Sequence, residues 1–395
     1  VLPKGFIDDI ENYSKEEIAL QVIRPYVGDV IPLKELEKIV TETINFDFPL
    51  KHVSDNISSL ELYHGPTLAF KDVGARFMSR CLRYFVRNEK KELTVLVATS
   101  GDTGGAVADG FYNVDGVNVV ILYPANKVSS IQELQLTTHG KNIKAISVEG
   151  SFDDCQNMVK QAFADEELNK NIFLTSANSI NVARWLPQQF YFFYAWKQWE
   201  DKKNPPVVSV PSGNFGNICA GLMAQASGLP ILHFIAACNA NSAVSEYLQT
   251  GKYAGKPVIP TMSNAMDVGN PSNFVRILEI FDQQYNNVKN ELTAFNISDE
   301  LTRQVIGEVF EKENYLLDPH GAVAYISLKE YLSNHPTQLG YFLETAHPVK
   351  FYDVVEPVIN SKIEIPDAVK KLFSKKKTSV KMKPEYALLK EFLYK

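Results

Sequence analysis

Lys71 is the residue whose type and position most directly suggest chemistry. It follows the apolar run Leu68-Ala69-Phe70, and apolar residues after Asp72 recur at helical spacing, which predicts a helix that begins near Asp72. Lys71 then lies at the amino end of that helix, where the helix dipole opposes a positive charge and favours the neutral amine. A neutral lysine amine can attack a carbonyl and form a Schiff base. An exposed lysine at a helix entrance is the commoner arrangement, so both interpretations stay open on this segment alone.

Residues 211–217 (PSGNFGN) are predicted to form an anion-binding loop between a strand and a helix. The glycines allow a tight turn, and the amides at the start of the following helix can hold a phosphate. The loop lacks the lysine and hydroxyl residue of a nucleoside-triphosphate loop and departs from the dinucleotide spacing. An ordinary strand-to-helix connection is the alternative.

A second loop of this kind is predicted at residues 99–105 (TSGDTGG). Its hydroxyls and free amides suit a carboxylate or another small anion at a helix amino end. Asp102 would repel a bare phosphate, which argues against a phosphate site at this loop. Capping of the helix by Ser100 or Asp102 is the alternative.

Residues 178–184 (NSINVAR) hold the side chains best suited to a second phosphate, which are Asn178, Ser179 and Arg184. The arginine supplies a planar fork of donors that matches a phosphate group. A capped helix with an exposed arginine is the alternative.

Two single residues later in the chain carry weaker signals. Thr345 ends a predicted strand and offers a neutral hydroxyl that suits a ring nitrogen, although strand-end threonines are common. His320 follows Asp318-Pro319, which is a typical helix start, so a capping role explains it as well as a catalytic role does.

The elements that must position these residues alternate between strands and helices, which predicts parallel sheets with crossover helices. In the first such region, the predicted strands are residues 94–98, 117–123, 143–148 and 172–175, and the predicted helices start near Thr103, Ser129 and Asp153. In the second region, we predict a strand at 207–210, a helix at 218–226 and a strand at 231–237. Residues 1–90 are mostly helical in pattern.

The predicted fold class is therefore α/β, with two α/β domains of which the smaller is inserted in the larger. Residues 1–90 are expected to form the first part of the large domain, residues 91–178 the small domain, and residues 179–395 the rest of the large domain with a C-terminal segment. A ligand site is expected in the cleft between the two domains. Residues 370–383, which contain seven lysines, are expected to be a solvated surface segment.

The composition is that of a globular enzyme or binding protein. Hydrophobic residues make up 45% and charged residues 22% of 395 residues, which excludes a disordered or fibrous chain. The net charge of -6 argues against a general nucleic-acid binder. The four cysteines contain no CxxC pair, so neither a metal cluster nor a disulfide framework is expected, and a cytoplasmic location fits best. We expect no membrane span and no signal peptide, and the absence of an initiator methionine suggests missing upstream residues.

The combination and order of these segments resemble the pyridoxal-phosphate enzymes of fold type II, and among them the threonine synthase family. The matching segments are HGPTLAFKD (64–72), SGDTGGA (100–106), NSINVAR (178–184), SGNFGN (212–217), DPHGAVA (318–324) and ETAHPVKF (344–351). The motifs SGDTG and GNFGN resemble the enteric bacterial and fungal branch more than the plant-type branch, which has Asn in place of Asp102.

The resemblance implies a role for each matching position. Lys71 would hold pyridoxal 5'-phosphate as a Schiff base and, once released, act as the base at Cα and Cβ of the substrate. Thr345 would bind the pyridine nitrogen and leave it largely unprotonated. The cofactor phosphate would be bound by Gly213, Asn214, Phe215, Gly216 and Asn217. The substrate carboxylate would face Ser100, Gly101, Asp102 and Thr103, and the substrate phosphate would be bound by Asn178, Ser179 and Arg184.

The resemblance also implies the reaction and its partners. The family converts O-phospho-L-homoserine and water to L-threonine and phosphate by γ-elimination and β-addition. A small-molecule substrate, no nucleic acid, no membrane, no metal and a monomer or homodimer are expected. The alternatives are a serine or threonine dehydratase or another β-replacement enzyme, which would not need the second phosphate site, and a catalytically silent homologue that binds phosphorylated ligands. Retention of Lys71, both loops and Thr345 disfavours the silent homologue.

Overall fold

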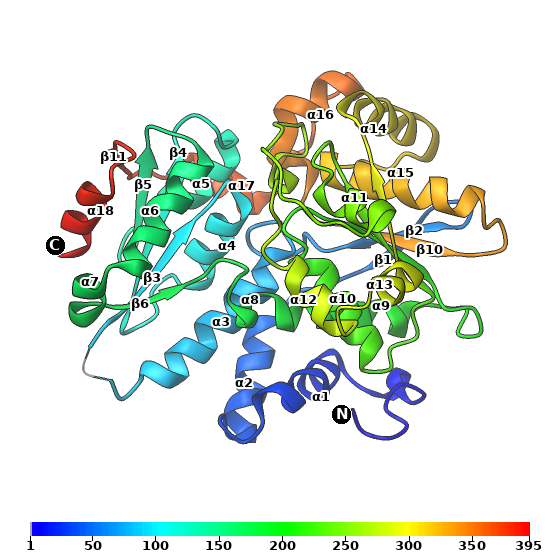
Figure 1. Cartoon of the computed structure of the whole chain (residues 1–395), viewed down its shortest axis with the longest axis horizontal. Coiled ribbons are helices and arrows are strands. Elements are labelled where there is room, and N and C mark those ends of the chain that lie inside the picture. Colours follow the sequence, from blue (N-terminus) through cyan, green and yellow to red (C-terminus); the bar gives the residue numbers. More distant parts are fainter. Residues whose placement is uncertain (1, 90) are drawn as a thin grey trace. The chain divides into compact units, whose positions relative to one another are not determined.

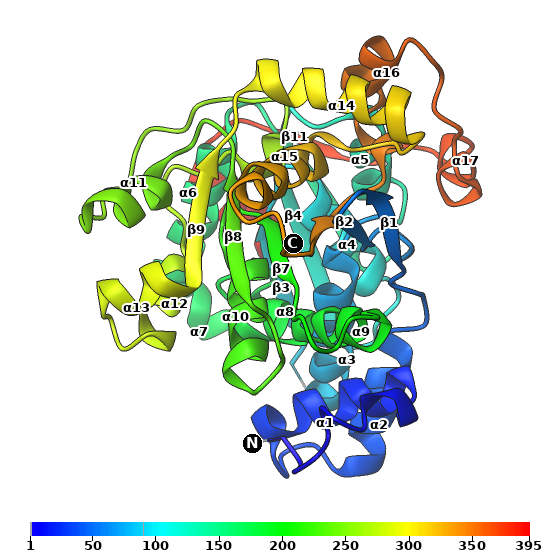
Figure 2. The ribbon, with the colours of Figure 1, turned by 90° about the vertical axis from the view of Figure 1, so that its right-hand side faces the viewer.

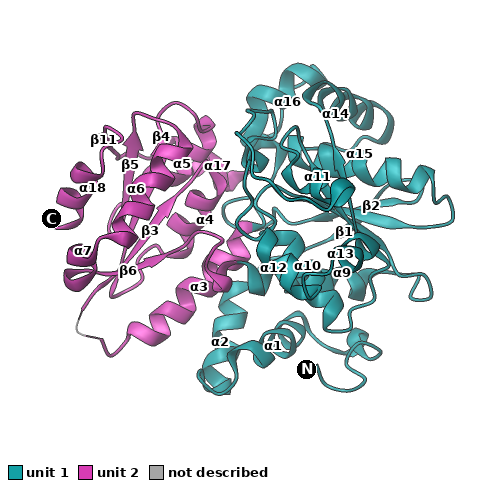
Figure 3. Ribbon diagram, viewed as in Figure 1, with its two compact units in different colours: residues 1–70, 185–364 teal, residues 71–184, 365–395 magenta. Residues whose placement is uncertain are grey.

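The chain forms two compact units, each built on one β-sheet (Figure 1). The computed structural model describes residues 2–89 and 91–395. The first unit contains residues up to 70 and residues 185–364, and the second contains residues 71–184 and 365–395 (Figure 3). The α/β fold class that was predicted from the sequence is confirmed.

The first unit contains a six-stranded sheet in the order β1-β2-β10-β7-β8-β9, with β9 at one edge beside β8 (Figure 2). Its strands are β1 (Leu50–Ser54), β2 (Ile57–Glu61), β7 (Val207–Pro211), β8 (His233–Cys238), β9 (Leu292–Asn296) and β10 (Gly340–Glu344). Strands β1 and β2 form an antiparallel hairpin, and every other neighbouring pair is parallel. The carboxyl ends of β2, β10, β7, β8 and β9 therefore lie along one edge of this sheet.

Helices provide the crossovers that parallel strands require. The α-helices of the first unit are α1 (Lys15–Val27), α2 (Leu33–Thr43), α9 (Gln189–Gln198), α10 (Gly216–Ala226), α11 (Ala243–Thr250), α12 (Phe274–Ile280), α13 (Tyr285–Glu291), α14 (Asp299–Glu313), α15 (Pro319–Ser333) and α16 (Tyr352–Ile359). Short 3-10 helices are η1 (Ile10–Asn12), η2 (Leu186–Gln188), η3 (Asn264–Met266) and η4 (Pro348–Phe351). Helix α15 packs along β7, β8 and β10.

The second unit contains a five-stranded parallel sheet in the order β11-β5-β4-β3-β6. Its strands are β3 (Leu93–Ala98), β4 (Val117–Pro124), β5 (Ile143–Val148), β6 (Phe173–Ser176) and β11 (Val380–Met382). Its helices are α3 (Lys71–Val86), α4 (Asp102–Gly110), α5 (Ser130–Thr137), α6 (Phe152–Ala164), α7 (Glu166–Asn171), α17 (Asp367–Phe373) and α18 (Tyr386–Leu393), and α8 (Val182–Trp185) lies where the chain passes to the first unit.

Alternate residues of β3 and β4 point to opposite faces of this sheet, and each face has its own core. Val95 and Ile121 pack with α3 and α4 in one hydrophobic cluster, whereas Leu96 and Val120 pack with α6 and α18 in the other. This two-residue period is the one that a strand imposes. Because both faces are covered, the strands are almost continuously apolar, which is why the sequence pattern located them.

Most of the predicted elements are confirmed. The predicted strands correspond to β3, β4, β5, β6, β7 and β8, and the predicted helix starts correspond to α3, α4, α5, α6 and α10. Ser129 caps α5 as part of a capping box, which explains why the helix begins at that residue. The mostly helical prediction for residues 1–90 missed the hairpin of β1 and β2, because β2 carries buried polar residues such as Ser59 and Glu61.

The compact units divide the chain differently from the expected domain boundaries of 90/91 and 178/179. The chain passes between the units after residues 70, 184 and 364. The C-terminal residues join the second unit because β11 pairs with β5, with Val380 opposite Ile146 and Met382 opposite Val148. The lysine-rich segment 370–383 is mostly exposed, as expected, but it contributes this edge strand and the buried side chain of Met382.

The four cysteines are buried and free, and burial raises the pKa of each thiol to about 12. Among residues 2–89 and 91–395, no cluster of three or more histidine, cysteine, aspartate or glutamate side chains is arranged to hold a metal ion. Within the same residues, each helix is too short or too polar to cross a bilayer.

Candidate active site

The segment that precedes Lys71 is bonded to the segment that contains Thr345. The amide of Phe70 donates a hydrogen bond of 2.9 Å to the carbonyl oxygen of Thr345, and the amide of His347 donates one of 3.0 Å to the carbonyl oxygen of Leu68. Between these bonds, Ala69 and Ala346 form an antiparallel bridge. Lys71 is the next residue and begins α3, which confirms the predicted helix start. The predicted Schiff-base lysine therefore directly follows a residue that is fixed on Thr345.

Two further features hold this segment in place. The ammonium of Lys350, a residue with no exposed surface, donates a hydrogen bond of 2.9 Å to the carbonyl oxygen of Thr67. Leu68 has a φ of +57°, which a leucine adopts only under strain and which places its amide within 3.1 Å of the carbonyl oxygen of Gly65. Strained backbone of this kind occurs most often where function fixes the chain.

Thr345 and residues 212–217 lie at the same edge of the first sheet. Thr345 follows β10, the loop follows β7, and the two strands are parallel neighbours with Phe342 opposite Ser209. Parallel strands end at a common edge, so the two predicted cofactor contacts come together. Thr345 itself is buried.

The loop 212–217 has the features of an anion site at the amino end of α10. Phe215 caps the helix in the left-handed conformation with a φ of +62°. The side-chain oxygen of Asn217 accepts a hydrogen bond of 2.5 Å from the Tyr191 hydroxyl, while its amide nitrogen is buried without a hydrogen-bond partner among the described residues. A buried donor that lacks a partner is costly unless a ligand supplies an acceptor. Asn217 is therefore ready to donate to an anion.

A second segment, residues 264–273, supports this loop. The side-chain oxygen of Asn214 accepts hydrogen bonds of 2.7 Å and 3.0 Å from the amide and hydroxyl of Ser272, and the carbonyl oxygen of Asn214 accepts one of 2.9 Å from the Asn273 side chain. A β-carbon on Gly213 would lie 2.5 Å from the α-carbon of Met266. This support could not be predicted from the sequence, because a coil segment with no periodicity carries no information about its contacts.

The predicted substrate loop at residues 100–103 lies in the second unit, at the end of β3 and the start of α4. The Thr99 hydroxyl accepts hydrogen bonds of 2.9 Å from the amides of Gly101 and Gly104, so these two amides are already used. Asp102 is buried and accepts a hydrogen bond of 2.9 Å from the Gln132 side chain. The loop is thus more internally bonded than the sequence indicated. The sequence analysis placed Thr99 in the loop but not its hydrogen-bonding role, and it missed Gln132.

The predicted phosphate cluster, Asn178, Ser179 and Arg184, also belongs to the second unit. The side chain of Asn178 is tied to β3, because its amide nitrogen donates to the Ala98 carbonyl at 2.7 Å and its oxygen accepts from the Ala98 amide at 3.3 Å. Arg184 is buried rather than exposed and donates to the carbonyl oxygen of Ala177. Burial lowers the pKa of the Arg184 guanidinium to about 10, against the opposite effect of the Asp72 charge, so the group remains positively charged at neutral pH. A β-carbon on Gly74 would lie 1.9 Å from the Arg184 carbonyl oxygen, which explains the glycine in α3.

His320 has the capping environment that its sequence context suggested. Asp318 is the N-cap of α15 and accepts a hydrogen bond of 2.7 Å from the His320 amide, and Pro319 occupies the first turn. The carboxylate of Glu344, the residue before Thr345, accepts a hydrogen bond of 2.7 Å from the Asp318 amide.

A second polar network, around Glu61, was not detected from the sequence. The Glu61 carboxylate lies 2.7 Å from the His64 imidazole and 3.1 Å from the Lys51 ammonium, and it accepts a hydrogen bond of 3.1 Å from the Tyr315 hydroxyl. Burial opposes ionisation of Glu61, but the hydrogen bonds from His64 and Lys51 outweigh it and lower the pKa of the carboxyl. Of these three partners of Glu61, only His64 lies in one of the sequence motifs, HGPTLAFKD.

Comparisons with known proteins show the family to which this chain belongs. The sequence model of a family described as pyridoxal-phosphate dependent enzyme matches residues 49–338, and a model of the C-terminal part of threonine synthase matches residues 322–393. The threonine synthase of Escherichia coli is 43% identical over 369 residues, which cover 92% of this chain and 85% of the relative, and that of Saccharomyces cerevisiae is 35% identical over 94% and 85%. This chain belongs to the threonine synthase family.

Solved structures of the threonine synthase family have the same fold. The crystal structure from Escherichia coli matches with a TM-score of 0.93 and 41% identity over 100% of this chain and 91% of that one. A structure from Brucella melitensis, described as PLP-bound threonine synthase, matches with a TM-score of 0.91 and 34% identity over 98% and 89%. A tomato threonine deaminase shares only 14% identity at a TM-score of 0.61, so it shows the fold alone.

As a member of the threonine synthase family, the chain depends on pyridoxal 5'-phosphate, and its residues fit this cofactor. The unpartnered amide nitrogen of Asn217 suits the cofactor phosphate, and Met266 packs tightly against Gly213 of the same loop. The amide of Phe70, the residue before Lys71, is hydrogen-bonded to the Thr345 carbonyl oxygen, so the backbones of these two predicted cofactor contacts lie close together.

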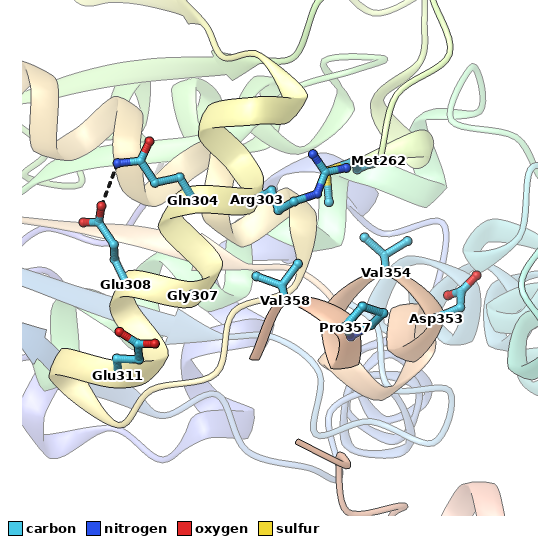
Figure 4. Close-up of a pocket in the computed structure, with 10 residues that line it drawn as sticks. All are labelled: Met262, Arg303, Gln304, Gly307, Glu308, Glu311, Asp353, Val354, Pro357 and Val358. Carbon is cyan, nitrogen blue, oxygen red and sulfur yellow. Dashed lines mark hydrogen bonds between the residues drawn. The ribbon is translucent and has the colours of Figure 1, made fainter. Parts of the chain in front are cut away.

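A separate surface pocket lies between α14 and α16 (Figure 4). Its volume is about 650 Å³, and its lining includes Arg303, Gly307, Glu308, Asp353 and Val358. None of the residues predicted from the sequence lines it.

Proposed function

We propose that this chain converts O-phospho-L-homoserine and water to L-threonine and phosphate. The observation that carries this proposal is the similarity to threonine synthases over more than nine-tenths of the chain, combined with the fixed connection between Phe70 and Thr345. When bound, the cofactor supplies an electron sink that stabilises negative charge at the substrate carbon next to nitrogen.

The residues of the first unit hold the cofactor in this proposal. Lys71 would form the covalent link, the amides of residues 213–217 and the side chain of Asn217 would bind the phosphate, and the Thr345 hydroxyl would donate a hydrogen bond to the ring nitrogen. A neutral hydroxyl partner leaves that nitrogen without a proton, whereas a carboxylate would favour the protonated form. Burial lowers the pKa of His347 to about 4, with a further contribution from His64, so His347 adds no positive charge beside Thr345 at neutral pH.

Lys71 is also the base of the proposed reaction. Once the substrate amine has displaced it, its neutral ε-amine would remove the proton from Cα, pass that proton on and then remove a proton from Cβ, while the Cγ–O bond breaks and phosphate leaves with the bonding electrons. Protons would be returned to Cγ and to Cα, and water would add its hydroxide at Cβ and give its proton to the phosphate, so that Lys71 is neutral again at the end.

The second unit supplies the proposed substrate contacts. The substrate carboxylate faces Ser100, Gly101, Asp102 and Thr103. The amides of Gly101 and Gly104 shape this loop rather than bind the carboxylate, because both already donate to the Thr99 hydroxyl. Asn178, Ser179 and Arg184 bind the leaving phosphate, and the buried Arg184 supplies the positive charge that the phosphate requires.

Replacing Arg184 tests the substrate assignment. Arg184→Leu should raise KM for O-phospho-L-homoserine more than about tenfold, because a charge-assisted pair to the phosphate is lost. Steady-state kinetics on the purified holoenzyme, with circular dichroism to confirm folding, measures this. An unchanged KM would show that the phosphate binds elsewhere, and turnover of L-serine or L-threonine in preference to the phosphorylated substrate would favour a dehydratase.

The cellular setting is part of the proposal. We propose a cytoplasmic enzyme that acts as a monomer or homodimer on a small-molecule substrate, without nucleic acid or membrane. The four buried, reduced cysteines support a reducing compartment. Light scattering of the purified protein measures the oligomeric state.

A further inference from the structure

Three buried side chains behind Thr345 have no role in the proposed reaction. Asp318 and Glu344 have no exposed surface, and His320 is 2% exposed. Buried ionisable groups are costly, so the contacts that retain them need an explanation.

The hydrogen bonds of His320 show which of its ring nitrogens carries the proton. Its Nε2 atom accepts a hydrogen bond of 3.2 Å from the Ala265 amide, and an amide N–H can only donate. The ring proton must then be on Nδ1, which lies 2.5 Å from Oδ1 of Asp318. His320 therefore links the N-cap of α15 to the backbone of η3.

One proton shared between the two carboxyl groups accounts for their environment. Oε1 of Glu344 accepts from the Asp318 amide, whereas Oε2 of Glu344 and Oδ2 of Asp318 are both buried without a partner among the described residues. Burial and then the negative charge of Asp318 raise the pKa of Glu344 well above its ordinary value. A proton on Glu344 that is donated to Asp318 satisfies both oxygens. Gly321 permits this approach, because a β-carbon there would lie 1.5 Å from Oε2 of Glu344.

The other end of this series of contacts reaches the loop of residues 212–217. Ala265 lies in η3, and the next residue, Met266, packs so closely on Gly213 that a β-carbon would lie 2.5 Å from its α-carbon. Releasing Ala265 from His320 frees the segment that packs against Gly213.

We propose that Glu344, Asp318 and His320 form a buried series of hydrogen bonds that holds η3 against Gly213 and so preorganises the loop for the cofactor phosphate. His320 is a positioning residue in this arrangement, since its hydrogen bonds join it to Asp318 and Ala265, neither of which is assigned to the cofactor or the substrate. The inference rests on the proposed assignment of the cofactor phosphate to residues 213–217.

The test compares the affinity of the apoprotein for pyridoxal 5'-phosphate with its affinity for pyridoxal, which lacks the phosphate. His320→Asn keeps a donor near Nδ1 for Asp318 but has no acceptor that reaches Ala265, whereas His320→Gln places an acceptor near Nε2. We expect His320→Asn to lower the ratio of the affinity for pyridoxal 5'-phosphate to the affinity for pyridoxal about tenfold. In His320→Gln this ratio should stay within about threefold of the wild-type value. Faster hydrogen exchange at the Ala265 amide should accompany the loss.

Each outcome has a distinct meaning. Equal losses of affinity for both ligands in His320→Asn, or an unchanged ratio, would overturn the positioning role, because a general structural defect does not act on the phosphate alone. The variant Asn217→Leu separates a failure of the positioning role of His320 from a failure of the assignment of the cofactor phosphate to residues 213–217. If Asn217→Leu leaves the ratio unchanged, the assignment of the phosphate to this loop is wrong; if it lowers the ratio and His320→Asn does not, only the present inference fails.

Discussion

At the residue scale, Glu344 is the side chain whose ionisation state matters most for the polar network behind Thr345. A glutamine is close to a protonated glutamate in shape, and it can donate to Asp318 Oδ2 while its oxygen still accepts from the Asp318 amide. We expect Glu344→Gln to be at least as stable as the wild type at pH 7, and Glu344→Leu to lose about 1–3 kcal/mol of unfolding free energy. Chemical denaturation of both variants measures this.

The pH dependence of the Glu344→Gln comparison has a defined sign. The pKa of Glu344 is raised in the folded protein, so its proton is retained there but released by the unfolded chain above about pH 4.5. Stability of the wild type relative to the variant should therefore fall as pH rises from 4.5 toward the folded-state pKa. A relative gain of wild-type stability over that range would mean that Glu344 is ionised when folded.

Residue types in the sequence identified candidate ligands but not where their hydrogen bonds go. Asn178 and Asn214 were predicted as ligands from their residue type and from the family resemblance, yet the side chain of each is bonded to a neighbouring segment. Arg184, expected as exposed under the alternative interpretation, is buried. The support that 264–273 gives to Gly213 comes from contacts distant in sequence, which local patterns do not encode.

At the element scale, His233 connects β8 to β9 and titrates in the acid range. Its Nε2 atom lies 2.8 Å from the Thr293 hydroxyl, and its ring stacks on Tyr331 with centroids 5.1 Å apart. Burial and then the charge of His335 lower the pKa of His233 to about 4 from 6.5. The unfolded chain therefore binds a proton first, and stability that is present above pH 6.5 is lost as pH falls toward 4.

His233→Phe tests this contribution, since phenylalanine keeps the stack on Tyr331 but does not titrate. The stability advantage of the wild type over the variant should shrink by on the order of 2–3 kcal/mol between pH 6.5 and 4. Thr293→Val is the matched control, because it removes the hydrogen-bond partner and keeps the titrating ring. Thermal melts across the pH range would contradict the prediction if the His233→Phe difference were constant.

The elements that the sequence predicted well are those with a strong apolar pattern. Strands β3, β4, β7 and β8 are buried on both faces, and their apolar runs marked them within a few residues. Strand β2 was missed because two of its buried residues, Ser59 and Glu61, are polar and interrupt the apolar pattern. Both are hydrogen-bonded to Tyr315. Strand β11 has three residues in a lysine-rich segment, and only its pairing with β5 reveals it.

At the scale of the whole molecule, the proposed functions are divided between the two units. Thr345 and the phosphate loop belong to the first unit, whereas residues 100–103 and the Arg184 cluster belong to the second. Lys71 is the first residue of the second unit. It directly follows Phe70 of the first unit, whose amide is hydrogen-bonded to Thr345. That the cofactor lies in a cleft between two domains stays a prediction.

The fate of water oxygen tests the proposed reaction most directly. Incubation of the holoenzyme with O-phospho-L-homoserine in ¹⁸O-labelled water should yield L-threonine with ¹⁸O in its hydroxyl group and an equal amount of unlabelled phosphate, since the C–O bond breaks and water adds at Cβ. Lys71→Ala should form neither product. Labelled phosphate with homoserine would show hydrolysis at phosphorus, and the absence of threonine from the holoenzyme reaction would contradict the proposed function.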